Sequence, residues 1–332
     1  MLYFCMANNL LDLGIWGASV YMDFHHISVM PQETVSGLVT NRDGVYVDCT
    51  LGGAGHSHLI ADMLTDKGRL IGIDQDESAI AAATERLKDC CCQVTIVQDN
   101  FRNLEQILQA QSAEQVDGVL FDLGVSSHQL DTAERGFSYM QDAPLDMRMN
   151  QHSNFSAYDV VNTYDEDELN RIFKEYGEER WSRRIAQFIA AARKKSPVKT
   201  TGELVDIIKR AVPAAVRNAK GGHPAKRIFQ AIRIEVNDEL GILEKSFRTA
   251  VAHLKPGGRI AIITFHSLED RIAKNVLREM SKGCICPPEM PICTCGHKPE
   301  VKLLVKGIAA SKEELEHNSR SKSAKLRIAE KL

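Results

Sequence analysis

The sequence lacks any long hydrophobic run. No window in its 332 residues approaches the roughly 18–20 uninterrupted apolar residues of a transmembrane helix, so no membrane span is predicted. With 22 glycines and 10 prolines, the chain is also too poor in both for a collagen-like or Pro/Gly-rich disordered protein. An ordinary globular composition remains, and the length favours more than one core, because single cores stop growing near ~250–300 residues.

A secretory signature is also missing. Residues 1–21 contain no Lys or Arg and are interrupted by Asp12, whereas a signal peptide has a basic start and a clean apolar run. The nine cysteines are an odd total with three adjacent at 90–92, unlike the disulfide framework of a secreted protein. We therefore expect a cytoplasmic protein in which residues 1–21 form an extension of unclear status.

Charge is unevenly distributed along the chain. Residues 1–130 contain 6 Lys and Arg against 17 Asp and Glu, whereas residues 131–332 contain 35 against 27. A basic second part suggests a polyanionic partner. Scattered solvated charge is the alternative.

Short apolar runs predict the strands of a parallel sheet. They lie at 45–50, 70–74, 94–97, 117–123 and 259–265, with later runs at 301–308 and 324–331. Because the first five are apolar throughout, helices should cover both faces of the sheet. The prediction is an α/β fold with a Rossmann-like, mostly parallel sheet.

Between about 156 and 254 no strand is predicted. Helical patterns cover 165–177 and 178–195, a capping box Thr200-x-x-Glu203 opens another helix, and apolar residues at 3–4 spacing predict one long helix from Phe229 to Leu254. We therefore expect an inserted helical, substrate-binding domain at 141–240. The α/β domain would comprise residues 22–140 and 241–332.

A glycine-rich loop, DCTLGGAGHS at 48–57, follows the first predicted strand, and Asp74 closes the second. Such a loop lets backbone approach a ligand, and a carboxylate ~20 residues downstream accepts hydrogen bonds from ribose hydroxyls. The loop lacks the lysine of a phosphate-binding loop and the spacing of dinucleotide folds, which favours S-adenosylmethionine. A tight turn beside a surface Asp is the alternative.

Two further segments follow predicted strands. FDLGVSSHQLD at 121–131 places Asp122 at a strand's carboxyl end, where open α/β sheets bind ligands. Thr264 to Arg271 suggests a hydrolase triad at first sight. No nucleophile elbow accompanies it, and a helix start capped by Ser267 explains its acidic residues.

The chain resembles the bacterial small-subunit ribosomal RNA cytosine-N4 methyltransferases from about Met22 to its C-terminus. The shared motifs are DCTLGGAGHS, GIDQD at 72–76, FDLGVSSHQLD, RGFSYMQDAPLDMRM at 135–149, YGEER at 176–180, HPAKRIFQAIRIEVNDEL at 223–240, FHSLEDR at 265–271 and NSRSKSAKLR at 318–327. Such long, ordered motifs make the resemblance specific.

The resemblance implies a class I methyltransferase domain that moves a methyl group from S-adenosyl-L-methionine to N4 of a cytosine in 16S rRNA. The site would lie in the decoding region of the small ribosomal subunit. Carried over by motif, the expected cofactor contacts are Ala54, Gly55, His56, Asp74, Phe101, Asp122 and Gln129.

Catalysis then needs an acceptor for the amine hydrogens, because the cytosine lone pair is delocalised into the ring. We expect Asp122 to orient the amine, with His266 as the weaker candidate. The base must be unstacked to enter the pocket. Alternatives are a Rossmann oxidoreductase, a non-enzymatic RNA-binding module, and a methyltransferase acting on DNA or a small molecule.

Basic residues of the second part are candidates for RNA phosphate contacts. They are Arg180, Arg183, Arg184, Arg193, Lys194, Lys195, Arg217, Lys220, Lys226 and Arg227, and, near the C-terminus, Arg320, Lys322, Lys325 and Arg327.

Four cysteines lie close together as two Cys-x-Cys pairs, Cys284-x-Cys286 and Cys293-x-Cys295, with His297 nearby. This pattern predicts either a compact structural zinc site or free thiols.

Overall fold

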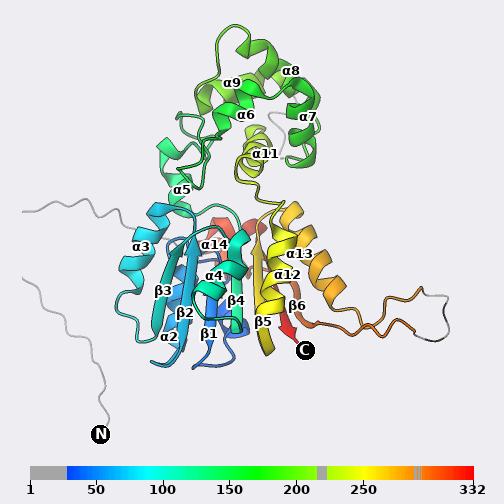
Figure 1. Cartoon of the computed structure of the whole chain (residues 1–332). Coiled ribbons are helices and arrows are strands. Elements are labelled where there is room, and N and C mark those ends of the chain that lie inside the picture. Colours follow the sequence, from blue (N-terminus) through cyan, green and yellow to red (C-terminus); the bar gives the residue numbers. More distant parts are fainter. Residues whose placement is uncertain (1–27, 215–222, 288–289, 291, 293) are drawn as a thin grey trace, which may run out of the picture.

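A seven-stranded sheet lies at the centre of the molecule (Figure 1). The computed structural model describes residues 28–214, 223–287, 290, 292 and 294–332. The strand order is β3-β2-β1-β4-β5-β7-β6, parallel from β3 to β5, with β7 antiparallel to both β5 and β6. The strands are β1 (Val45–Asp48), β2 (Arg69–Asp74), β3 (Gln93–Gln98), β4 (Val116–Asp122), β5 (Leu254–Thr264), β6 (Val301–Ala309) and β7 (Lys325–Lys331). This architecture confirms the predicted α/β fold.

Helices cover both faces of the sheet. One face packs against α4 (Leu104–Ala110), α12 (Leu243–His253) and α13 (Ser267–Met280). The other packs against α1 (Pro31–Leu38), α2 (Gly55–Met63) and α3 (Glu77–Leu87). Successive strand residues alternate between the two cores, as Tyr46 and Val47 do in β1. Short helices lie at α5 (Ser127–Asp131), α14 (Lys312–His317), η1 (Phe101–Asn103), η2 (Ala133–Arg135) and η3 (Ser319–Ser323).

The order of the strands reverses between β1 and β4. The chain runs outward from β1 through β2 to β3, then returns to place β4 on the other side of β1. Ligands of open α/β sheets bind at the carboxyl ends of strands at this switch point. Asp48, Asp74 and Asp122 are the last residues of β1, β2 and β4, so three carboxylates meet there.

A second group of helices lies beyond the carboxyl end of the sheet (Figure 1). It comprises α6 (Ala157–Thr163), α7 (Glu166–Glu175), α8 (Ser182–Arg193), α9 (Thr201–Ala211) and α11 (Ala225–Asn237). These helices share a hydrophobic core that includes Phe173, Ile189 and Ile208. The predicted capping box at Thr200 and Glu203 is present.

The prediction of one long helix from Phe229 to Leu254 is wrong. The chain forms α11 and α12, separated at Asp238, whose φ of 51° is left-handed. Asn237 secures the end of α11, because its amide accepts the Met149 N–H and donates to the Met147 carbonyl at 2.8 Å each. The two helices bury their apolar faces in different cores, and a continuous 3–4 spacing cannot show that.

Strand β5 also begins earlier than predicted. It starts at Leu254, before Pro256-Gly257-Gly258, and the pairing with β4 shifts register between Val116 and Gly118. Gly118 itself tolerates no side chain, because a Cβ there would lie 2.6 Å from the Tyr46 ring.

Candidate active site

A cavity of about 390 Å³ opens at the carboxyl ends of the central strands. This volume lies within the usual range for small-molecule sites, ~300–1,000 Å³. Its lining comes from the glycine-rich loop, from the ends of β2, β4 and β5, from α11, and from the segment at 319–323. The cavity therefore touches the sheet and the second group of helices at once.

Asp74 and the glycine-rich loop are joined directly. The Asp74 carboxylate accepts the backbone N–H of Gly52 at 2.8 Å and that of Asp76 at 2.9 Å. Gly52 has a φ of 49°, a conformation that glycine adopts without strain. Burial raises the pKa of Asp74 to about 6, although both backbone hydrogen bonds oppose the rise.

Asp48 was not assigned a role from the sequence, yet it is buried and belongs to the lining of the cavity. It accepts a hydrogen bond from the Ser57 hydroxyl at 2.7 Å and from the Thr50 backbone at 3.1 Å. Burial raises the pKa of Asp48, partly offset by the Ser57 hydroxyl and the His56 charge. Thr50 in turn accepts the backbone N–H of Asp122 at 2.6 Å, which joins the loop to β4.

His56 and Asp122 form a buried pair. His56 Nδ1 lies 3.3 Å from Asp122 Oδ2, and His56 Nε2 lies 2.9 Å from the Val29 carbonyl oxygen. Burial would lower the pKa of His56, but the Asp122 carboxylate outweighs it and the pKa is raised. Asp122 Oδ2 thus contacts His56, whereas Asp122 Oδ1 is not used in this pair.

One buried polar atom of the cavity has no partner. Within the described part of the chain, Asp122 Oδ1 is a buried side-chain atom without a hydrogen-bond partner. A buried polar atom without a partner is costly, and such an atom points to a ligand. The site therefore offers a free carboxylate oxygen to whatever binds there, beside a lining that includes His266.

His266 also caps a helix, which corrects the prediction of a Ser267 cap. Its ring Nδ1 accepts the Glu269 backbone N–H at 3.4 Å at the start of α13. Ser267 instead donates its hydroxyl to Glu178 at 2.7 Å. The serine is bonded to a carboxylate and not to the histidine, so the segment is not arranged as a hydrolase triad.

An acidic pair surrounds His266. Its Nε2 lies 3.1 Å from Glu269 Oε1, and Glu239 belongs to the same cluster. Burial would raise the pKa of Glu269, but the His266 ring and the Arg233 charge lower it. Glu239 accepts two hydrogen bonds from Arg233, both 2.8 Å. Glu239 was not predicted as a site residue, because it lies in the break between α11 and α12 that the helix prediction missed.

The structure brings most of the predicted cofactor contacts to one cavity. Gly55, His56, Asp74, Phe101, Asp122 and Gln129 line it. Phe101 stands edge-on to Phe121 at 5.5 Å between ring centroids. Gln129 is held on both sides, by the Ser126 capping box and by its donation to Asp76 at 2.8 Å.

Ala54 differs from the other predicted contacts. It is fully buried in the core beside the sheet, and it is not among the residues that line the cavity. Its backbone N–H donates to the Leu51 carbonyl at 2.8 Å. Ala54 therefore shapes the turn that precedes α2.

The predicted phosphate contacts divide into groups. Lys226, Arg320 and Lys322 line the cavity, and Arg180, Arg183, Arg184, Lys194 and Lys195 are exposed on the second group of helices. Arg217 and Lys220 lie outside the described residues.

Several members of that set are engaged within the protein, including the cavity residue Arg320, which pairs with Asp131 at 3.0 Å. Arg193 donates to the Val161 carbonyl at 2.8 Å, and Arg227 lies 3.8 Å from Glu179. For Arg327 the prediction of a phosphate contact is wrong, because its side chain is buried and pairs with Asp270 at 2.7 Å. Lys325 pairs with the same carboxylate at 3.1 Å.

In the part of the chain that the structure describes, no helix has both the length and the apolar character of a membrane span.

Comparison with known proteins covers nearly the whole chain. Residues 23–332 match the sequence model of the MraW methylase family. A protein of Clostridium botulinum (strain Loch Maree / Type A3) named ribosomal RNA small subunit methyltransferase H is 59% identical over 312 residues, 94% of this chain and 100% of that protein. Proteins of the same name from Clostridioides difficile (strain 630) and Brevibacillus brevis are each 57% identical over 94% of this chain, covering 100% and 99% of their own lengths.

Proposed function

The chain belongs to the MraW methylase family, and from that premise we propose that it transfers a methyl group from S-adenosyl-L-methionine to the exocyclic N4 of a cytosine in 16S rRNA. The target would lie in the decoding region of the small ribosomal subunit. The observation that carries the proposal is the unpartnered Asp122 Oδ1 in a cavity at the strand ends, whose lining also includes His266.

The residues at one end of the cavity suit S-adenosylmethionine. Asp74 would accept the ribose hydroxyls and Phe101 would stack on the adenine. The loop at 49–56 has no lysine or arginine for a pyrophosphate, whereas the Asp48 carboxylate at the end of β1 suits the positive charge of S-adenosylmethionine. S-adenosylmethionine supplies an electrophilic methyl group when bound.

The residues at the other end suit a cytosine. Asp122 Oδ1 can accept one hydrogen of the exocyclic amine, because His56 already occupies Oδ2. His266 lines the same cavity, with its Nε2 3.1 Å from Glu269 Oε1. An acceptor such as Asp122 Oδ1 matches the amine hydrogens on N4 of cytosine and mismatches O4 of uracil.

These contacts also explain how the protein assists the reaction. Accepting an amine hydrogen at Asp122 draws the nitrogen lone pair out of conjugation with the ring. Fixed positioning of the two reactants can supply ~7–11 kcal/mol of the barrier. The chain's own contribution is therefore placement and hydrogen bonding.

The test is methylation with labelled S-adenosylmethionine of naked 16S rRNA, assembled small subunits, and DNA, followed by nucleoside analysis. We expect label in N4-methylcytidine from the ribosomal substrate. Label in another nucleoside, or in DNA alone, would overturn the proposal.

Cofactor affinity should depend on pH through Asp74. Because the pKa of Asp74 is raised to about 6, lowering the pH through this value protonates the carboxylate and removes an acceptor. Affinity for S-adenosylhomocysteine, measured by calorimetry, should therefore fall below about pH 6. Asp74→Ala should weaken the binding free energy of the cofactor by about 1.5–3 kcal/mol at neutral pH, the value of a hydrogen bond to a charged group.

Asp74→Asn is the control for this pH dependence. An amide does not titrate, so the Asp74 part of the pH dependence should vanish in that variant. Unchanged affinity in Asp74→Ala would remove this residue from the cofactor site.

RNA affinity should depend steeply on salt, because the basic residues Lys226, Arg320 and Lys322 line the cavity. Lys226→Glu with Lys322→Glu should weaken rRNA binding and flatten the plot of log affinity against log salt by about 0.7–0.9 per lost phosphate contact. Filter binding across a salt series measures both the rRNA affinity and its dependence on salt. Lys67→Glu, at an exposed position before β2 and outside the cavity lining, is the matched control and should leave the slope unchanged. Equal slopes in all three proteins would place the RNA on another surface.

A further inference from the structure

The segment at 281–300 joins α13 to β6, and its described residues extend away from the rest of the molecule (Figure 1). None of its described residues is buried, and Ile285 and Ile292 are 59% and 72% exposed. Its described residues also form no helix or strand. Because no hydrophobic core holds this segment, a covalent or metal crosslink is the usual means of ordering it.

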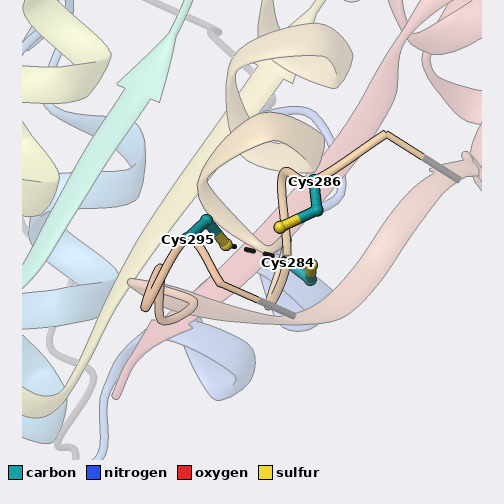
Figure 2. Close-up of side chains that lie close together, drawn as sticks. All are labelled: Cys284, Cys286 and Cys295. Atoms are coloured by element: carbon teal, nitrogen blue, oxygen red, sulfur yellow. Dashed lines mark hydrogen bonds between the residues drawn. The ribbon is translucent and has the colours of Figure 1, made fainter. Parts of the chain in front are cut away.

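Three cysteine side chains gather within the segment. Cys284 and Cys286 lie on the limb that leaves α13, and Cys295 lies on the limb that returns to β6 (Figure 2). Their three sulfur atoms all lie within 4.8 Å of one another. Residues remote from one another in the loop thus present three soft ligands to a common point.

The spacing of the sulfurs suits a tetrahedral metal ion. Cys284 Sγ and Cys295 Sγ are 3.8 Å apart. Two thiolates bound to one tetrahedral Zn²⁺ at ~2.3 Å each would be separated by about 3.8 Å. A disulfide would require about 2.05 Å.

The backbone also supports a ligand role for Cys286. Backbone hydrogen bonds reach its thiol from Thr294 and Cys295 on the opposite limb. Hydrogen bonds to the ligand atoms are a regular feature of metal sites, where they orient the ligands.

We propose that Cys284, Cys286 and Cys295 bind one Zn²⁺ ion that ties the two limbs of segment 281–300 together. The ion replaces the thiol protons, up to three of which pass to the solvent. None of these cysteines lines the active-site cavity, so the metal is structural. Cys293, which the sequence grouped with them, lies outside the described residues.

The first test is metal content of the full chain, purified under reducing conditions from zinc-supplemented cells. We expect about one equivalent of zinc by elemental analysis, and loss of that zinc in Cys284→Ser with Cys295→Ser. Cys91→Ser is the matched control, because Cys91 is an exposed free cysteine elsewhere in the chain, and it should retain the metal. Thermal unfolding of the double variant should match the wild type, because the segment lies outside the hydrophobic cores.

The second test is proteolysis. Lys282 is an exposed trypsin site just before the first of the cysteines, and chelation should speed cleavage there several-fold. Adding Zn²⁺ back should restore protection in the wild type and not in the double variant. The proposal is overturned if reduced protein takes up no zinc on titration, if the double variant still binds it, or if Cys284 and Cys295 form a disulfide.

Discussion

Replacing Asp122 with asparagine is expected to lower the single-turnover rate of methyl transfer by roughly 10²-fold or more at saturating cofactor. Asparagine keeps the size and one acceptor oxygen but removes the negative charge. If Asp122 orients the cytosine amine as proposed, the amine loses its conjugation against this carboxylate, and the negative charge matters most in the transition state. Affinity for S-adenosylhomocysteine should change little.

The alternative role for Asp122 gives a different result. If Asp122 only anchors the methionine ammonium, cofactor affinity should drop, and saturating cofactor should restore most of the rate. Asp66→Asn, an exposed carboxylate at the other end of the sheet, is the control and should behave as wild type. A near-wild-type rate for Asp122→Asn at saturation would exclude the catalytic role.

Arg135→Met is expected to lower the free energy of unfolding by about 3–5 kcal/mol, because it leaves a buried carboxylate without its counter-charge. Arg135 Nη1 lies 2.8 Å from Asp76 Oδ2, and the side chains are 8% and 1% exposed. The guanidinium also donates to the carbonyls of Arg148 and Met149 at 2.9 and 3.3 Å. It therefore holds the segment at 135–149, including the cavity residue Met149, against the sheet.

Adding Asp76→Asn to Arg135→Met should recover part of the loss, because a neutral amide needs no counter-charge. Denaturant unfolding of the four proteins of this double-mutant cycle measures the coupling. If the losses in free energy of unfolding caused by Arg135→Met and Asp76→Asn simply add, the ion pair between Arg135 and Asp76 does not stabilise the fold.

The same pair predicts a pH dependence of stability. Burial alone would raise the pKa of Asp76, but hydrogen bonds from Ser78 and Gln129 and the Arg135 charge lower it below 3.8. A carboxylate with a lowered pKa stabilises the fold above its unfolded pKa and loses this contribution as the pH falls. The difference in free energy of unfolding between the wild type and Arg135→Met should therefore become smaller below about pH 3.8.

The sequence alone determined the sheet and the glycine-rich loop. Strands buried on both faces are continuous apolar runs, so β1, β2, β4 and β5 were visible without any tertiary information. The carboxylates that end such strands must meet at one edge, which is why Asp74 and Asp122 could be placed at a single site before the structure was described.

Only the tertiary structure decided which side chains face one another. The break at Asp238 was hidden because a 3–4 repeat reports a buried helix face without saying which core buries it. Glu239 and its place beside His266 were hidden with it. The burial of Arg327 against Asp270, and the pairing of His56 with Asp122, depend on contacts between distant parts of the chain. Local sequence periodicity does not predict such contacts, because they form only when the sheet and its helices pack together.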